Sequence, residues 1–194
     1  LGRKDDKREK EEQERREEEM DRRVLAIATL GTFNLHQFVL LPFVYDIILQ
    51  FLKDPCTRMR KQAALTCCQV LVQPGRPQFY TGASGKVTEK ILCKVLDVVV
   101  SDRCSDIRKT LLSTLDSRFD VYLSRAHHIQ TMFLLLGDEE LDIRLPALEL
   151  LGRLAQLNPA CVLPMLRQTL GQIVVVLKFN TDDGVREDAT WMLC

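Results

Sequence analysis

The strongest constraint in this sequence is an arginine motif that recurs along the chain at intervals of 36 to 48 residues. Four segments align on it: "DPCTRMRKQAALTCCQV", "DRCSDIRKTLLSTLDSR", "DEELDIRLPALELLGRL" and "NTDDGVREDATWMLC". Each arginine follows an apolar residue, and small or apolar residues stand three and seven positions after it. The aligned arginines are Arg60, Arg108, Arg144 and Arg186, and a shorter copy, "RRVLAIATLGTF", surrounds Arg23. A unit of this length indicates stacked structural repeats.

Apolar residues within these intervals recur at spacings of three and four, which is the pattern of amphipathic helices. Asp54-Pro55 and Asn158-Pro159 predict helix starts, because each offers an N-cap residue followed by proline at the first helical position. Strand signals are scarce after Val24. The predicted fold class is therefore all-α, a HEAT-repeat α-solenoid of stacked antiparallel helix pairs, with four to five complete or partial repeats over residues 24–194.

Two segments depart from the repeat pattern. In residues 3–23 every position except Gln13 and Met20 is charged, with nine basic and ten acidic residues, so residues 1–23 are predicted to form a solvated charged helix or a disordered insertion. Residues 73–86, "QPGRPQFYTGASGK", hold three glycines and two prolines and are predicted to form a long exposed loop.

Composition narrows the function classes. Net charge is zero and the pI is near 7.0, so no global field attracts nucleic acid or an anionic membrane, and we expect neither direct nucleic-acid binding nor more than indirect membrane association. The seven cysteines form no CxxC pair, which indicates a reducing, intracellular compartment. The apolar stretch "FVLLPFVYDIILQFL" is interrupted by Pro42 and Asp46, and no membrane-spanning segment is predicted.

Candidate chemical motifs fail on their spacing. "YTGASGKVT" lacks the first glycine of a phosphate loop and has Val87 after Lys86. His127 and His128 are adjacent, so they are expected to face different sides of a helix, and no second ligand pair stands at zinc spacing. Cys67-Cys68 has no activating neighbour and is typical of core packing. The glycine-rich, HRD and DFG motifs of protein kinases are absent from the sequence. We expect no catalytic, cofactor-binding or metal-binding residues in this segment.

Two stretches carry a more specific resemblance. "ATLGTFNLHQFVLLPFVYDIILQFL", and the run from "SDIRKTLLSTLDSRFDVYLS" through "IRLPALELLGRLAQLNPA" to "LPMLRQTLGQI", resemble the amino-terminal HEAT-repeat region of target of rapamycin (TOR) protein kinases. The resemblance is collinear from about Ala26 to Leu193. It has no counterpart for the charged block before Val24 and matches the 73–86 loop loosely.

The resemblance implies a fragment of a very large serine/threonine kinase of the phosphatidylinositol 3-kinase-related class. The catalytic domain, with its ATP and Mg²⁺, would lie far downstream of this segment. The solenoid would hold regulatory subunits and a second copy of the kinase in a nutrient-responsive growth-control complex. The implied localisation is cytoplasmic, with the parent also nuclear or recruited to lysosomal or vacuolar membranes. The alternative is a free-standing HEAT or armadillo-type adaptor for transport or nucleic-acid-associated assembly.

Site residues follow from the same resemblance. In HEAT repeats the aspartate of the turn and the arginine of the second helix bond to neighbouring repeats. This structural ladder role falls on Asp54, Arg60, Asp102, Arg108, Asp138, Arg144 and Arg186. A separate prediction concerns "LDSRFD", where the other copies continue an apolar helix and this copy turns polar. Here we expect a capped helix end or a docking edge formed by Asp116, Arg118 and Asp120.

Overall fold

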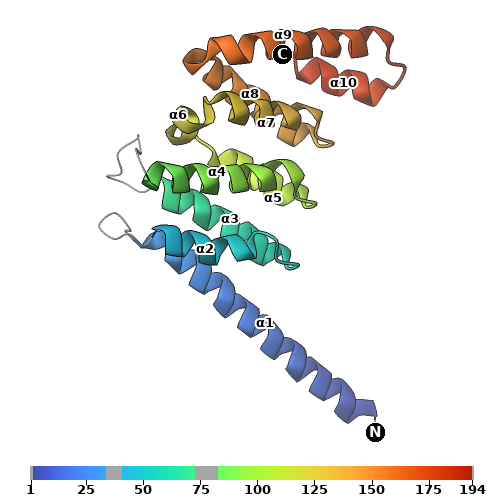
Figure 1. Cartoon of the computed structure of the whole chain (residues 1–194). Coiled ribbons are helices and arrows are strands. Elements are labelled where there is room, and N and C mark those ends of the chain that lie inside the picture. Colours follow the sequence, from blue (N-terminus) through green and yellow to red (C-terminus); the bar gives the residue numbers. More distant parts are fainter. Residues whose placement is uncertain (1, 34–40, 73–82, 194) are drawn as a thin grey trace. The chain divides into compact units, whose positions relative to one another are not determined.

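A computed structural model describes residues 2–33, 41–72 and 83–193 of the chain. All regular secondary structure in these ranges is helical (Figure 1), so the predicted all-α class is confirmed. The chain divides into two compact units, Leu1–Ile91 and Leu92–Cys194. The boundary falls within helix α4 (Ala83–Ser101). The arrangement inside each unit positions the charged contacts described below.

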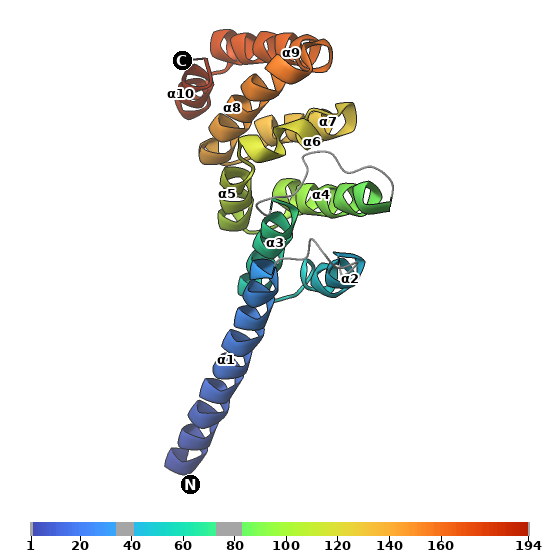
Figure 2. The same cartoon turned by 90° about the vertical axis from the view of Figure 1, so that its left-hand side faces the viewer.

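The first unit is built around α1 (Gly2–Thr32), α2 (Leu41–Phe51) and α3 (Thr57–Leu71). The charged block is helical, since α1 runs through it without a break. Only the carboxyl-terminal part of α1 packs on α3 (Figure 2): Ile27 is buried, and its carbonyl accepts a hydrogen bond from the buried Thr66 hydroxyl at 3.1 Å. Gly31 lies against the Gln69 and Thr66 side chains, so a side chain at this position would require Gln69 to move.

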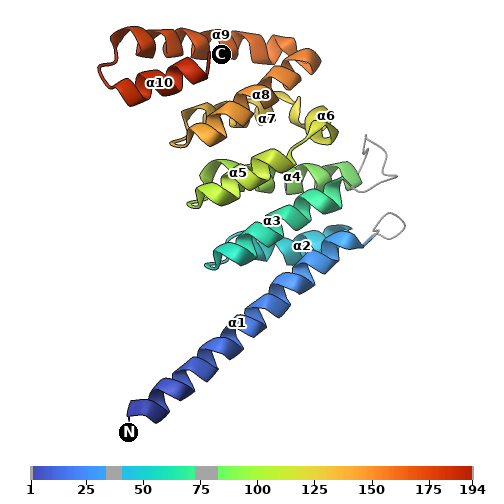
Figure 3. The same cartoon turned by 180° about the vertical axis from the view of Figure 1, so that it is seen from behind.

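The second unit continues with α5 (Ser105–Thr114), the short helices η1 (Ser117–Phe119) and α6 (Asp120–Leu123), and α7 (Ala126–Leu134). After the turn η2 (Leu135–Gly137) come α8 (Leu141–Leu157), α9 (Pro159–Phe179) and α10 (Asp183–Trp191). Helices α5 and α8 pack together, as do α7 and α9, and α9 also contacts α8 and α10 (Figure 3). Helices of successive predicted repeats are therefore in contact, as in a HEAT-type stack.

The arginine motif has the same local structure in each of its four complete copies. Every aligned arginine is the fourth residue of its helix, in α3, α5, α8 and α10. Six residues earlier, an aspartate or asparagine accepts a hydrogen bond from the backbone N–H two residues on, at 2.7–3.0 Å; these residues are Asp54, Asp102, Asp138 and Asn180. This turn stops the preceding helix and sets the entry into the next one.

The two predicted helix starts have different outcomes. Asn158 caps α9 with its side chain accepting from the Cys161 N–H, and Pro159 is the first helical residue, as predicted. The prediction at Asp54-Pro55 was wrong, because α3 begins at Thr57. The Asp54 carboxylate bonds to the Cys56 N–H instead and forms the turn before the helix.

Burial follows the repeat alignment. The apolar residue before each arginine is buried in the first three copies, at Met59, Ile107 and Ile143, each no more than 1% exposed. Val185, the equivalent residue in the fourth copy, is 41% exposed. The surface of α10 therefore carries the apolar pattern of a repeat interface but is not covered within the described residues.

Two sequence predictions need correction. The predicted loop 73–86 lies outside the described residues over 73–82, and its last four residues belong to α4, which begins at Ala83. A membrane-spanning segment was not predicted, yet α9 is long and apolar enough to cross a bilayer by length and composition, with a mean hydropathy of 1.6. Within the second unit, α9 packs against α7, α8 and α10.

Candidate functional site

The candidate site is a series of charged contacts between successive repeats of the second unit. Its centre is Arg108, in the first turn of α5. The guanidinium donates from Nε and Nη2 to the two carboxylate oxygens of Asp138, at 2.9 and 2.8 Å. Its Nη1 donates to the Asp102 carbonyl at 2.8 Å. One arginine therefore binds both the turn of its own repeat and the turn of the next.

This ion pair is nearly closed to solvent. The Arg108 and Asp138 side chains are 11% and 6% exposed. Burial would raise the pKa of Asp138, but hydrogen bonds from Arg108 and from the Glu140 N–H outweigh it and hold that pKa below its ordinary value. The hydrogen bond to Asp138 raises the pKa of Arg108. Both groups are ionised at neutral pH, in a fixed two-pronged geometry.

A second ion pair lies nearby at the surface and joins α5 to α8 itself, whereas Asp138 stands in the turn before α8. Lys109, next to Arg108, forms an ion pair with Asp142 on α8, and the two side chains are 54% and 68% exposed. Exposed pairs of this kind contribute little to stability, since water screens them and both long side chains lose freedom. The two neighbouring pairs thus both start from α5 and differ in burial.

Arg144 takes a different partner from the one the repeat pattern suggests. The aligned position of the next repeat holds Asn180, which has no charge. Arg144 instead forms an ion pair with Asp188 on α10, while its buried Nε has no hydrogen-bond partner among the described residues. The contact still links α8 to α10, but it lacks the two-pronged geometry of the Arg108 pair.

The remaining predicted ladder residues make local contacts. Arg60 donates to the carbonyls of Asp54 and Pro55, at 2.9 and 3.2 Å, which repeats the bond of Arg108 to the Asp102 carbonyl. Arg186 pairs with Asp183 in the first turn of its own helix, at 3.4 Å. A role between repeats stays a prediction for these residues.

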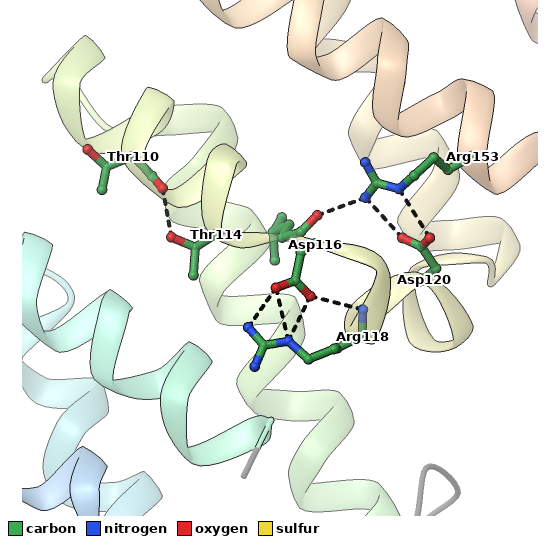
Figure 4. A network of polar contacts seen from close by, with 7 residues as sticks. Thr110, Thr114, Asp116, Arg118, Asp120 and Arg153 are labelled. Carbon is green, nitrogen blue, oxygen red and sulfur yellow. Dashed lines mark hydrogen bonds and ion pairs between the residues drawn. The ribbon is translucent and has the colours of Figure 1, made fainter. Parts of the chain in front are cut away.

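A contact that the sequence analysis missed lies beside the polar stretch after α5 (Figure 4). Arg153 on α8 reaches both carboxylate oxygens of Asp120 at 3.1 Å and the carbonyl of Leu115 at 2.9 Å. Asp120 is 9% exposed, so it does not form a docking edge, contrary to the prediction; its carboxylate is turned toward α8. The available signal was a single arginine within the apolar run "LLGRLAQL".

Asp116 and Arg118 remain at the surface. The Asp116 carboxylate caps η1 by accepting from the Arg118 N–H at 2.9 Å and also binds the Arg118 guanidinium (Figure 4). The hydrogen bond from the Arg118 side chain lowers the pKa of Asp116. Asp116 therefore caps the start of η1 and not the end of α5, and the Asp116 and Arg118 side chains are 42% and 61% exposed.

The two cysteines of α3 are buried and are therefore shielded from reagents in solution. Cys67 and Cys68 are 3% and 1% exposed, and burial raises the pKa of Cys67 above the ordinary thiol range. A buried thiol that stays protonated at neutral pH is a poor nucleophile. This agrees with the core-packing interpretation of the Cys67-Cys68 pair.

Comparison with known proteins gives a consistent match. The chain is 34% identical over 170 residues to the serine/threonine-protein kinase tor1 of Schizosaccharomyces pombe, covering 88% of this chain and 7% of that protein. It is 36% identical over 180 residues to the serine/threonine-protein kinase TOR of Arabidopsis thaliana, covering 87% and 7%. For the serine/threonine-protein kinase TOR2 of Saccharomyces cerevisiae the identity is 34% over 160 residues, covering 82% and 6%.

No protein-family model matches the chain. The chain spans about 7% of the length of the curated relatives above, which are therefore far longer than the segment. The similarity nonetheless covers most of this chain, in kinases from yeasts and a plant. The helical fold and the sequence similarity together show that the chain belongs to the TOR kinase family and is a segment of such a kinase.

Proposed function

We propose that this chain is a non-catalytic HEAT scaffold within a TOR-type serine/threonine protein kinase. It would mediate docking of protein subunits and of a second kinase copy in a cytoplasmic, nutrient-responsive growth-control complex. Phosphoryl transfer, with its ATP and Mg²⁺, would belong to another part of the parent protein. The proposal for the parent rests on the family, and the proposal for the segment rests on its contacts.

The observation that carries the proposal is the buried pair of Arg108 and Asp138. A scaffold must keep its docking surfaces in a fixed relation, and apolar contacts alone allow helices to slide past one another. A two-pronged ion pair has one favourable geometry. It therefore favours a single register between α5 and α8.

The apolar outer surface of α9 and α10 also suits a scaffold. Val174, Val175 and Phe179 on α9 are each more than half exposed, and Trp191 on α10 is 56% exposed. Large exposed apolar residues on two neighbouring helices are available for contact with another protein surface. We assign this surface to adjoining parts of the parent protein, in keeping with the greater length of its relatives.

The docking edge now rests on the exposed pair of Asp116 and Arg118. The test is a double charge reversal, Asp116→Arg with Arg118→Asp, in the full-length parent kinase purified from cells. The reversed pair can still form an ion pair, while the order of charges presented to a partner changes. We expect less co-purified subunit or second kinase copy, with unchanged phosphorylation of a short peptide substrate.

A matched control is the exposed pair of Lys94 and Asp97 on α4, 3.2 Å apart, with the charges exchanged in the same way. It should leave co-purification unchanged. Loss of peptide phosphorylation with intact assembly, in the Asp116/Arg118 variant only, would count against a scaffold role. Equal assembly in both variants would remove the docking edge from the proposal.

A further inference from the structure

The amino-terminal turn of α7 brings its two histidines together. The rings of His127 and His128 have centroids 3.9 Å apart and planes tilted by 47°. Their adjacency in the sequence therefore does not keep their rings apart, although different helix faces were one of the two reasons for expecting no metal site here. His127 is exposed, whereas His128 is 1% exposed.

A third donor comes from the preceding repeat. The Sγ atom of Cys93 on α4 and one nitrogen from each histidine lie within 4.8 Å of one another. All three residues belong to the second unit. Donors around tetrahedral zinc, at 2.0–2.3 Å from the metal, stand about 3.5 Å apart, so side-chain adjustments of about 1 Å would complete the geometry.

The chemistry of this group suits a zinc ion. One thiolate and two imidazoles are the mixed sulfur and nitrogen donors that Zn²⁺ prefers, and carboxylate-binding ions such as Mg²⁺ and Ca²⁺ do not use them. The fourth position falls to solvent, next to the exposed ring of His127.

From these contacts we propose that Cys93, His127 and His128 form a zinc site that ties α4 to the start of α7. Binding converts the Cys93 thiol to a thiolate and releases its proton to solvent. The site would stabilise the joint between two repeats and has no catalytic role.

The experiment uses the full 194-residue chain, purified with a chelator and a reductant that contains no thiol. Titration with Co²⁺ reports the ligands directly, because a cobalt-bound thiolate gives a charge-transfer band in the near ultraviolet. Displacement by Zn²⁺ then gives the zinc affinity and stoichiometry. We expect one equivalent of metal, a thiolate band, and a thermal midpoint that rises with Zn²⁺ concentration.

Three variants decide the assignment. Cys93→Ala removes the sulfur donor, and His127→Ala removes an exposed donor whose loss leaves the buried core intact. Cys161→Ala is the control, because Cys161 is likewise a half-buried cysteine outside any disulfide in this unit but lies on α9. Circular dichroism confirms that each variant is folded before titration.

We expect Cys93→Ala to abolish the thiolate band. Both site variants should weaken zinc binding by more than the roughly 10–100-fold that loss of an outer-shell partner costs. Cys161→Ala should match the wild-type chain. A cobalt complex without a thiolate band, or zinc affinity unchanged in folded His127→Ala, would overturn the proposal. This result is independent of the scaffold role, which the co-purification experiment tests.

Discussion

The sharpest prediction concerns Arg108→Met. Methionine keeps much of the apolar stem of arginine but removes two hydrogen bonds to Asp138 and one to the Asp102 carbonyl. It leaves the Asp138 carboxylate, 6% exposed, without its cation. Because an isolated buried charge is far costlier than the net contribution of the pair, the loss should be large.

Removing one partner of a buried ion pair costs about 3–5 kcal/mol. In a chain of this size each kcal/mol lowers the thermal midpoint by about 2–4 °C, so Arg108→Met should lower it by about 6–20 °C. The assay is thermal unfolding of the whole chain followed by circular dichroism, with urea unfolding as a second measure. Both should report the same order among the variants.

Lys109→Met is the matched control. It removes the neighbouring ion pair between α5 and α8, at a site where both side chains are more than half exposed. The expected cost is at most about 1 kcal/mol. Similar thermal midpoints for Arg108→Met and Lys109→Met would refute the argument that burial makes the Arg108–Asp138 pair the larger contribution to stability.

Arg108→Met combined with Asp138→Asn tests the cause of the loss. Asparagine removes the charge and keeps an oxygen for the Glu140 N–H, which the carboxylate binds at 3.0 Å. If an uncompensated charge is responsible, the double variant should be more stable than Arg108→Met alone. A double variant less stable than the single one would show that lost packing dominates.

Four further outcomes are expected. The loss of stability caused by Arg108→Met should become smaller in acid. Folding lowers the pKa of Asp138, so the ionised carboxylate stabilises the folded chain at pH values above the unfolded pKa near 3.8. This stabilisation is lost as the pH falls through the folded-state pKa of Asp138. A penalty that stays constant into acid in urea titrations would contradict this. Gly152→Ala should raise the free energy of unfolding by about 0.5–1 kcal/mol, because this helical position is exposed and open; a lower midpoint would disprove it. Arg153→Met should lower the midpoint by less than Arg108→Met, since the Arg153 side chain is 40% exposed, and the two melting curves check the order. Cys67 should alkylate more slowly than a half-exposed cysteine in the folded chain and equally fast in urea, as mass spectrometry can measure.

The repeats could be predicted because their signal is local and recurs. The arginine motif marks the same turn and the same helical position in each copy, and both depend on a few neighbouring residues. Errors in helix starts were small and had a local cause. The Asp54 carboxylate accepts a hydrogen bond from the Cys56 N–H in the turn and does not cap the helix. A short polar side chain can form either hydrogen bond, so the sequence alone does not decide between them.

The partners of the charged residues could not be predicted in the same way. Arg144 reaches Asp188 and Arg153 reaches Asp120, and both contacts depend on how a neighbouring helix is oriented. The sequence shows that Asn180 interrupts the pattern but does not show which acid replaces it. The approach of Cys93 to the paired histidines is equally a product of packing between repeats.

The long charged helix also determines how the chain behaves in solution. Helix α1 has 31 residues, which at 1.5 Å per residue gives about 46 Å. Among the described residues, its ion pair to another helix joins Asp21 to Arg58 on α3 at 2.5 Å. Residues 10–19 are exposed, held by pairs such as Arg23 with Glu19 rather than by a core. A fluorophore at residue 10 would thus sit about 16 Å of helix away from that ion pair. Its depolarisation would report the bending of an isolated helical arm, separately from the tumbling of the packed helices.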